Sequence, residues 1–452
     1  MTAHGTAHGT VHGGGRGWAL PAAAGPAVPS TVPWGRVLVA LAIGYFILQH
    51  GLFVPGGPFL RGGVQVGAED VANGPRQVVW PLLLLAAVPL GVWVHGRVRR
   101  LALSMPFVTA ALAWSWASVG WAAFPMVSLK RVLLLTVVTL VFLIGAAAVR
   151  RPAELWRPVA LVLAGIIAID LVSAVFVPSL GREDSGAFVG LHASKNTAGA
   201  ISALAILVWF FAGRFLPEWR GLRVLVLLAG LAFLAGTDSK TSMGALLVSG
   251  GTAVVLTALA RAGPLTVAVG LWLALVLAAL AGFAVYLVTP AAVLTALFGD
   301  ATLTGRTDLW GFLWPFVGDR PWTGMGYQSL WLTGGVGVIE RWSPSFLNWA
   351  VHQAHNGYLD LLLTTGVIGL GLLLAGVAAG MVRALALEAA GRSPGCGALA
   401  VSVLVFALIH NATESSLLRG DHTVWGFTFL ALVSAALGRR ASGKKTSLHR
   451  NP

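Results

Sequence analysis

Residues 357–381 read GYLDLLLTTGVIGLGLLLAGVAAGM, a stretch with a single charged side chain. A helix of roughly 20 apolar residues crosses the hydrocarbon core of a bilayer, which is about 30 Å thick. No water is present there to satisfy backbone N–H and C=O groups, and an α-helix satisfies them internally. We therefore expect residues 357–381 to form a transmembrane helix.

Similar apolar runs occur along the whole chain. Including the first, they lie at about residues 37–54, 78–94, 102–118, 132–148, 159–178, 197–212, 224–236, 243–260, 265–289, 357–381, 396–410 and 423–438. The composition agrees, because 57% hydrophobic and 10% charged residues with a mean hydropathy of +0.81 exclude a water-soluble domain. The sequence predicts an all-α, polytopic membrane protein with about twelve transmembrane helices. They form one domain over residues 36–438.

The distribution of Lys and Arg predicts the orientation of this domain. With an even number of spans, both termini lie on one side. If that side is the cytoplasm, 19 of the 30 basic residues fall in the shorter, cytoplasmic segments and 11 on the opposite face, as the positive-inside rule requires. The net charge of +14 then reflects orientation against an anionic inner leaflet, and nucleic acid is not an expected partner.

The two ends of the chain and its cysteine content carry further expectations. Residues 1–35 begin with three short repeats, each ending in His-Gly, and their composition predicts a disordered cytoplasmic tail; weak metal binding by these histidines is the alternative. Residues 439–452 form a basic cytoplasmic tail. Cys396 is the single cysteine, which excludes an internal disulfide or a cysteine metal cluster.

Four polar clusters lie in segments predicted to face away from the cytoplasm. They cover residues 181–196, 237–242, the long loop 290–356 before the tenth span, and 410–415. Lys195 and Lys240 each lie where a helix is expected to begin, and unpaired backbone N–H groups and the helix dipole favour anions there. Arg306 offers a planar fork that grips phosphate through two hydrogen bonds. Three such cations together would suit a diphosphate.

Several short motifs carry a resemblance to a known family. They are His192-Ala193-Ser194-Lys195-Asn196, Ser239-Lys240-Thr241, Gly305-Arg306-Thr307 with Trp310, Pro321 followed by Gly324-Met325-Gly326, His355-Asn356 with Leu359, and Gly366 with Gly369. In this order and placement, the chain resembles the O-antigen ligase and polysaccharide polymerase superfamily of bacterial inner-membrane glycosyltransferases. The resemblance extends over most of the hydrophobic body, and the motif spellings are closer to the exopolysaccharide polymerase branch.

The resemblance implies a reaction and its partners. A glycan leaves a polyprenyl diphosphate-linked oligosaccharide donor and joins an acceptor hydroxyl on the periplasmic face, with inversion and without metal or another cofactor. The partners are the donor, the glycan acceptor and the lipid bilayer, with other polysaccharide assembly and export proteins as candidates. The family's functional positions map onto Lys240, Arg306 and His355. Many ligases have Arg in place of Lys240, and Lys keeps the charge but loses the fork.

The residue types support the same chemistry. Departure of the diphosphate builds negative charge, which Arg306, Lys240 and Lys195 could stabilise. His355 suits a general base, because an imidazole titrates near neutral pH. The supporting residues that we expect are Asn356, Asn196, Ser239, Asp308 and Glu414. The sequence contains no Asp-x-Asp motif, so no metal site is predicted.

Simpler interpretations of these residues remain open. Arg306 could form a surface ion pair with Asp308, and His355 could merely precede a helix cap at Asn356. The two lysines could reach lipid headgroups, and Glu414 could make a helix-end hydrogen bond. His192 could be structural or interfacial, and Asp170 could pair with a neighbouring helix. Contacts with glycan or with lipid phosphate are open to Lys130, Arg131, Arg182 and Arg419. Six tryptophans of the long loop could stack on sugars or anchor short helices at the membrane surface.

Three alternative functions also fit about twelve spans. An O-antigen ligase would transfer the glycan to a lipid A core sugar instead of to a second lipid-linked repeat unit. A transporter or flippase would carry broken helices at the middle of the bilayer and charges around an internal cavity. An inactive scaffold of an export complex would be indifferent to loss of Arg306 and His355.

Overall fold

The computed structural model describes residues 33–49, 68–263, 305–331, 338–342 and 353–438, with single positions at 266, 267, 270 and 344; the side chains of 68–74, 338 and 340 are excepted. All of these residues belong to one compact unit. The predicted tail at 439–452, the tail at 1–35 up to residue 32, and most of the predicted span at 265–289 lie outside them. The long loop 290–356 is described at 305–331, 338–342, 344 and 353–356.

The described regular elements are helices. They are α1 (Pro33–Leu48), α2 (Ala68–Trp93), α3 (His95–Leu103), α4 (Pro106–Ala117), α5 (Pro125–Ala148), α6 (Pro152–Phe176), α7 (Pro178–Gly181), α8 (Lys195–Ala212), α9 (Arg220–Gly236), α10 (Lys240–Ala262), α13 (Arg306–Asp319), α14 (Val338–Trp342), α15 (Gly357–Ala389), α16 (Cys396–His410) and α17 (Thr423–Gly438). Two short 3₁₀ helices lie at Ser118–Trp121 and Pro217–Trp219. The described part of the chain contains no strand, and the predicted all-α membrane class is confirmed.

The helices match the predicted apolar runs closely. Seven described helices are long and apolar enough to cross a membrane, and α1, α16 and α17 are apolar but shorter. The run predicted at 102–118 falls mainly on α4, and its first two residues lie at the end of α3, which meets the helical segment Pro106–Trp121 at 93°. Pro106 opens α4, and a proline lacks the N–H that would continue α3. The total of about twelve spans stays a prediction.

Prolines and a polar cap mark where several of the helices begin. Pro106, Pro125 and Pro152 each occupy the first turn, where a missing N–H costs nothing. Ser194 caps α8 by accepting a hydrogen bond from the backbone N–H of Thr197. A polar cap of this kind satisfies one of the N–H groups that a helix start leaves open. The starts of the helices are therefore sharply defined.

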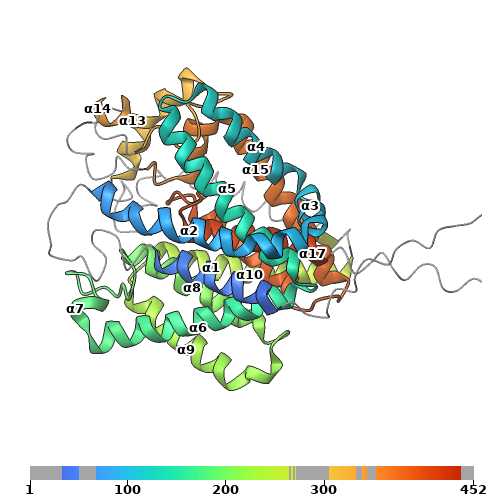
Figure 1. The fold of residues 1–452 in the computed structure, drawn as a ribbon. Helices are drawn as coiled ribbons and strands as arrows, with labels where there is room; N and C mark the ends of the chain where they lie inside the picture. Colours follow the sequence, from blue (N-terminus) through green and yellow to red (C-terminus); the bar gives the residue numbers. More distant parts are fainter. Residues whose placement is uncertain are drawn as a thin grey trace, which may run out of the picture. The chain divides into compact units, whose positions relative to one another are not determined.

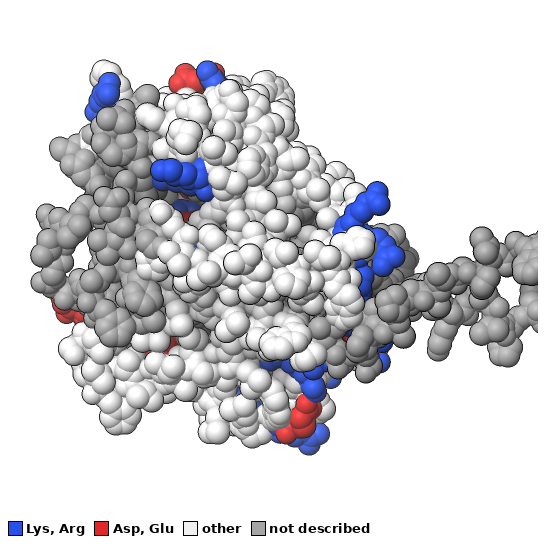
Figure 2. Space-filling view, in the orientation of Figure 1, with Lys and Arg blue, Asp and Glu red and all other residues white. Residues whose placement is uncertain are grey.

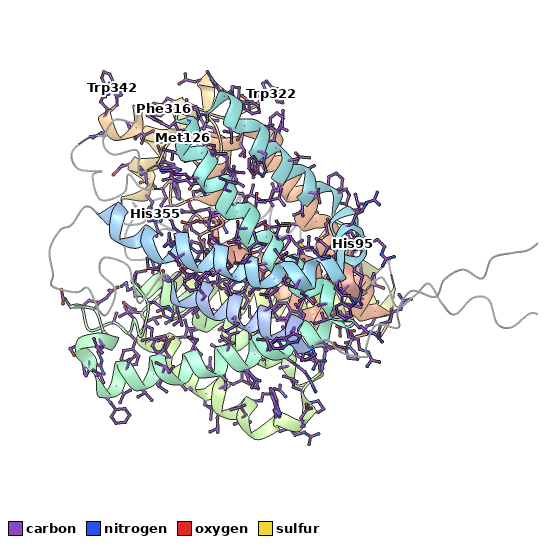
Figure 3. All side chains as sticks on the ribbon, in the orientation of Figure 1. His95, Met126, Phe316, Trp322, Trp342 and His355 are labelled. Carbon is purple, nitrogen blue, oxygen red and sulfur yellow. The ribbon has the colours of Figure 1, made fainter. Side chains whose placement is uncertain are left out.

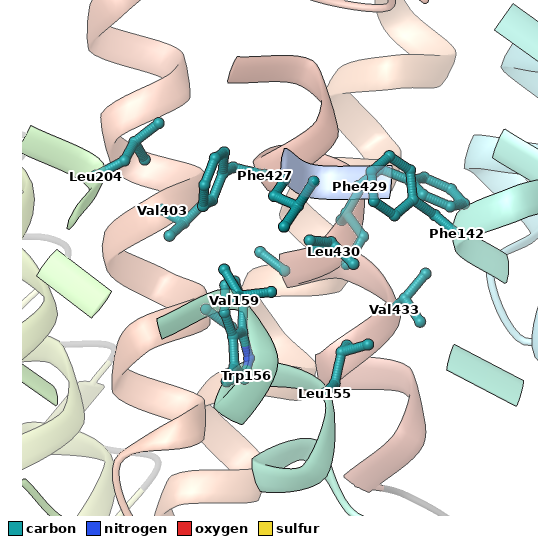
Figure 4. Packing of buried hydrophobic residues seen from close by; sticks show 14 of the residues in the cluster. Phe142, Leu155, Trp156, Val159, Leu204, Val403, Phe427, Phe429, Leu430 and Val433 are labelled. Carbon is teal, nitrogen blue, oxygen red and sulfur yellow. The ribbon is translucent and has the colours of Figure 1, made fainter. Parts of the chain in front are cut away.

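The most buried helices are α8, α16 and α17, which pack with α6 in the core. Figure 4 shows Trp156, Leu204, Val403 and Phe427 meeting there. Trp156 Nε1 donates to Ser434 Oγ at 2.9 Å, so the buried indole is satisfied. On the outer surface, Figure 2 shows few charged atoms and a largely uncharged middle on the face in view, as expected for a surface in contact with lipid.

Helices α8, α10, α15 and α16 are tied together at one end by Glu388. Its fully buried carboxylate accepts from Arg214 at 3.2 Å and Arg261 at 2.5 Å, and from the backbone N–H of Gly395. These partners come from the ends of α8 and α10 and the start of α16. An unpaired buried carboxylate would be costly, so the two arginines and the amide hold the helix ends in register.

The ion pairs separate into two groups along the helices. Arg36–Glu154, Arg157–Glu218, Arg214–Glu388 and Arg261–Glu388 join segments predicted on the cytoplasmic face; Arg76–Asp421, Lys195–Asp238, Arg306–Glu414 and Arg419–Asp421 join segments predicted on the opposite face. This separation agrees with the predicted alternation of the spans. Helices α13 and α14 lie at one end of the bundle, away from α3 (Figure 1).

Helix α15 is broken at Gly366, and part of the long loop fills the break. Gly366 has φ 68°, and the N–H groups of Val367 and Ile368 donate to the carbonyls of Pro321 and Trp322 at 2.8 and 3.3 Å. The backbone of Gly324 packs against Thr364, where a Cβ would be 2.5 Å from the carbonyl carbon. The glycines of the sequence motifs thus allow the loop backbone to dock directly into α15.

Replacing Gly366 with alanine is expected to destabilise the protein by at least about 1–3 kcal/mol. A Cβ at Gly366 would lie 2.3 Å from the carbonyl group of Trp322, in addition to the strain of the positive φ. A Cβ at Gly371, in the same helix, would contact nothing within 4 Å from outside the helix's own local backbone, and Gly371→Ala is the matched control. Thermal unfolding in detergent measures both variants, and equal melting temperatures would contradict the docking.

Candidate functional site

The loop between α16 and α17, residues 411–422, is organised by Asn411. Its Oδ1 accepts from the backbone N–H groups of Ser416 and Leu417 at 2.7 and 3.0 Å. The backbone N–H of Gly357 contacts the carbonyls of both Asn411 and Glu414 at 2.9 Å. A Cβ at Gly357 would lie 2.0 Å from Asn411 Oδ1, so only glycine fits at the start of α15. The loop is therefore fixed against α15 with Glu414 at their junction.

Glu414 is the centre of the site. Its Oε1 accepts from Arg306 Nη2 at 2.7 Å and from Asn196 Nδ2 at 3.0 Å. Its Oε2 lies 3.2 Å from His355 Nδ1. The side chains of Arg306, His355 and Glu414 are only 14–17% exposed. Four segments far apart in the sequence therefore meet at one carboxylate.

The network continues from Asn196 to the start of α10. Ser239 Oγ lies 3.4 Å from Asn196 Oδ1 and 2.9 Å from Ser242 Oγ. Helices α8, α10, α13 and α15 begin at or beside Asn196, Ser239, Arg306 and His355. The positive ends of four helix dipoles thus meet near Glu414, in an arrangement that attracts anions.

The surroundings of Glu414 set its charge. Burial raises the pKa of the carboxyl group, but the hydrogen bond to His355 and the charge of Arg306 lower it by more. The net result is a pKa below the ordinary value of a glutamate. Glu414 therefore stays ionised at neutral pH and holds Arg306 and His355 as a carboxylate.

His355 stands in a strained turn just before α15. Its φ is +46°, in the left-handed region that few residues other than glycine adopt. The cap of α15 is Asn356, whose Oδ1 accepts from the N–H groups of Tyr358 and Leu359 at 3.1 Å. The backbone N–H of Asn356 in turn donates to Ser415 Oγ. The cap and the loop 411–422 together hold the turn that points His355 at Glu414.

The remaining predicted residues lie at the edge of this network. Lys195 Nζ is 3.8 Å from Asp238 Oδ2, and its side chain is 38% exposed. Lys240 and Asp308 are exposed on the first turns of α10 and α13. Their roles stay predictions. The proposed surface pair of Arg306 with Asp308 is not among the described ion pairs, in which Arg306 contacts Glu414.

A second polar network adjoins the first. Arg419 donates through Nε and Nη2 to both carboxylate oxygens of Asp421, at 3.2 and 3.0 Å. Its Nη1 donates to Gln353 Oε1 at 2.8 Å, and Gln353 Nε2 lies 3.3 Å from His355 Nδ1. Sequence reasoning missed this network. The Arg-Gly-Asp spacing at 419–421 was a visible signal, whereas nothing in the sequence singled out Gln353.

Other basic residues in the predicted outer segments have structural partners. Arg182 Nε donates to the carbonyl of Ala174, and its guanidinium lies over the ring of Phe188. Arg131 donates to the backbone carbonyls of Gln328 and Trp331. These contacts tie loops to helices.

Asp170 and His192 form a separate, completely buried pair. His192 Nε2 lies 2.9 Å from Asp170 Oδ2, and the N–H of Leu191 donates to Asp170 Oδ1. The expectation that Asp170 pairs with a neighbouring helix is wrong, because its partners belong to the loop before α8. The loop can reach Asp170 because Gly190, which has no Cβ, lies directly against its carboxylate.

Figure 3 shows His355 near the end of the bundle that carries Phe316 and Trp342, with His95 at the opposite end. Among the described residues, no three His, Cys, Asp or Glu side chains are grouped so that they could hold a metal ion. Metal independence stays a prediction. What the site offers chemically is one imidazole, one carboxylate and cationic groups at several helix starts.

The chain was compared with known protein families, and the match covers several segments of the site. Residues 224–374 match the family described as O-antigen ligase. The matched stretch is about a third of the chain. It contains Ser239, Lys240, Arg306 and His355, whereas Glu414 lies beyond it. The family resemblance predicted from the sequence motifs is confirmed for residues 224–374.

Part of the chain is also similar to a protein named for polysaccharide production. The exopolysaccharide production protein ExoQ of Rhizobium meliloti (strain 1021) is 31% identical over 196 residues. The match covers 41% of this chain and 44% of ExoQ, so the chain spans less than half the length of this relative.

Proposed function

We propose that this protein is an inner-membrane glycosyltransferase that moves a glycan from a polyprenyl diphosphate carrier to an acceptor hydroxyl. The observation that carries the proposal is the meeting of Arg306 and His355 at Glu414. It brings an anion-binding group and a proton acceptor together at the convergent starts of four helices. The O-antigen ligase family match supports the reaction class.

Arg306 is the proposed diphosphate-binding group. Its described bond to Glu414 uses Nη2, whereas a guanidinium has five N–H donors arranged as a fork. Those donors suit the leaving diphosphate, on which negative charge grows as the glycosidic bond breaks. Lys195 and Lys240 are proposed to add charge from the starts of α8 and α10. The 38% exposure of the Lys195 side chain and the exposed position of Lys240 support access by a lipid-linked anion.

His355 is the proposed general base. When its Nδ1 carries a proton that Glu414 accepts in a hydrogen bond, Nε2 carries the lone pair that can take the proton of the acceptor hydroxyl. The resulting imidazolium is stabilised by the Glu414 carboxylate. The hydroxyl oxygen then bonds to the anomeric carbon, and the diphosphate leaves with the electrons of the broken bond. A back-side attack of this kind inverts the anomeric centre.

The acceptor is proposed to be a second lipid-linked repeat unit, which makes the protein a polymerase. The relative ExoQ bears the name of an exopolysaccharide production protein, and this supports the polymerase over a ligase that uses lipid A core sugars. We place the reaction on the periplasmic face, because the positive-inside rule assigns the site segments there.

The transporter alternative is less well supported. It predicts broken helices that expose backbone groups to a substrate cavity. Helix α15 is broken at Gly366, but the N–H groups that follow bond to the carbonyls of Pro321 and Trp322. The break is therefore filled by the protein's own backbone.

The test is glycan transfer by the purified protein in lipid nanodiscs. The nanodiscs are given a polyprenyl diphosphate-linked repeat unit, with or without lipid A core acceptor. A polymerase is expected to lengthen the lipid-linked glycan and release polyprenyl diphosphate without the core acceptor. Products that form only with the core acceptor would identify a ligase. Transfer of donor across sealed vesicles without any new glycosidic bond would contradict the proposal.

A further inference from the structure

A pocket lies between α15 and α17 at the predicted cytoplasmic end of the bundle. Its volume is about 450 Å³, within the range of about 300–1,000 Å³ that is usual for small-ligand pockets. The small side chains of Ala379, Ala386 and Ala435 and the backbone of Gly438 leave this space between the two helices. We call it the α15–α17 pocket.

The α15–α17 pocket extends from the end of α15 into its apolar part. Arg392 lies three residues beyond the last residue of α15, and Ala379 lies ten residues before it. At 1.5 Å per residue, those ten residues span about 15 Å, which is half of the hydrocarbon core of a bilayer. The side chain of Val382, on the pocket wall, is 67% exposed, so the pocket reaches the surface that we expect lipid to cover. A matching ligand has one polar end and one apolar end.

Two arginines make the polar end of the pocket positive. Arg383 and Arg392 line it, and the described lining residues include no Asp or Glu. The acid nearest to them in the sequence is Glu388, which is fully buried and already paired with Arg214 and Arg261. The positive charge of the lining is therefore not balanced by an acid of the pocket itself.

We propose that the α15–α17 pocket binds one anionic phospholipid of the cytoplasmic leaflet, whose phosphate is held by Arg383 and Arg392 and whose acyl chain lies along Ala379 and Val382. Basic pockets between transmembrane helices on the cytoplasmic side suit anionic headgroups, and an arginine can hold phosphate through two hydrogen bonds. The carboxyl ends of α15 and α17 disfavour anions, so the arginines must supply the attraction. This inference does not depend on the proposed transfer reaction, whose residues lie at the start of α15.

The chain's own C-terminal segment is a poor occupant of the pocket. Residues 439–452 carry five basic residues and no acidic one, so their charge repels Arg383 and Arg392. The same charge attracts anionic lipid to this end of the protein. Helix α3, which packs against α17, adds three further arginines. On the face in view, Figure 2 shows Lys and Arg side chains near the end of the bundle where Figure 1 places α3.

The test is native mass spectrometry of the whole chain in detergent, titrated with dioleoyl phosphatidylglycerol or dioleoyl phosphatidylethanolamine. The two lipids share the phosphate and the acyl chains, but only phosphatidylglycerol has a net negative charge. The first phosphatidylglycerol molecule is expected to bind several times more tightly than the first phosphatidylethanolamine. Arg383→Gln and Arg392→Gln should each weaken its binding roughly fivefold, and the double variant roughly 25-fold, the usual contribution of basic residues at an anionic membrane surface.

Two further variants separate the pocket from the general charge of this face. Ala386→Leu keeps both arginines but narrows the pocket, and it is expected to weaken phosphatidylglycerol binding severalfold. Arg220→Gln is the matched control, because Arg220 is exposed at the start of α9, on the same predicted face, and does not line the pocket. Its binding of phosphatidylglycerol should equal that of the wild type.

Three results would overturn the proposal. The first is equal affinity of the wild type for the two lipids. The second is a preference for phosphatidylglycerol that survives both in the double arginine variant and in Ala386→Leu. The third is severalfold tighter binding by a protein that ends at Gly438, because this would identify residues 439–452 as the occupant; unchanged or weaker binding is expected. Glycan transfer enters none of these measurements, so their outcome leaves the proposed function untouched.

Discussion

Arg306→Ala is expected to reduce glycan transfer by about two to three orders of magnitude, the usual effect of removing one preorganised group that stabilises transition-state charge. Arg306 is the cation closest to the centre of the site, with its guanidinium 2.7 Å from Glu414 and only 14% of its side chain exposed. The rate of polymer formation from purified donor, measured in nanodiscs, checks the prediction. Wild-type activity in a folded variant would rule out a role in diphosphate binding.

Two further variants separate charge from geometry and from folding. Arg306→Lys keeps the charge that Glu414 needs and is expected to fold normally, but it loses the fork and should have intermediate activity. Arg320→Ala removes an exposed arginine of the same long loop, whose described bond goes to the carbonyl of Trp121. It is the control for non-specific loss of positive charge, and near wild-type transfer is expected.

His355→Ala is expected to lower kcat by roughly two to four orders of magnitude, the range that a positioned general base supplies. KM for the donor lipid should change little, because Arg306 and the lysines remain. Steady-state transfer rates at several donor concentrations measure both constants. His95→Ala is the control, since this exposed histidine lies at the opposite end of the bundle, bonded to the carbonyl of Val92 (Figure 3).

A double variant tests whether His355 and Glu414 act as one unit. Glu414→Gln keeps hydrogen-bonding groups for its neighbours but removes the carboxylate that holds His355. If the pair acts together, Glu414→Gln combined with His355→Ala should be no slower than His355→Ala alone. Fully multiplicative losses would mean that Glu414 acts through Arg306 or Asn196 and does not orient the base.

The sequence predicted the helices well because their signal is local. An apolar run of sufficient length indicates a helix wherever it packs, and Pro125 or Pro152 marks its start. The bend between α3 and α4 was missed because the apolar run continues across Pro106. The mean hydropathy of a stretch of residues does not report a change in the direction of the helix axis. Only the proline itself indicated the change.

The site was predictable to the extent that its residues lie in recognisable motifs. Arg306 and His355 were identified from such motifs, but their meeting at Glu414 depends on contacts between residues 108 and 59 positions apart. From the sequence alone, Glu414, which follows α16, could have any of several roles. Only its contacts in the folded protein decide between them. The packing of α8, α10, α15 and α16 sets these contacts, and no single stretch of sequence encodes that packing.

The filled break in α15 also limits how the proposed lipid-linked donor could reach the candidate site. The carbonyls of Pro321 and Trp322 serve as hydrogen-bond acceptors for α15 itself, so this part of the long loop behaves as a rigid arm of the helix. It cannot swing aside without leaving two N–H groups unsatisfied, at a cost of about 1–3 kcal/mol for each. Any movement that admits the donor must therefore carry α15 along with the arm or take place on another side of the site.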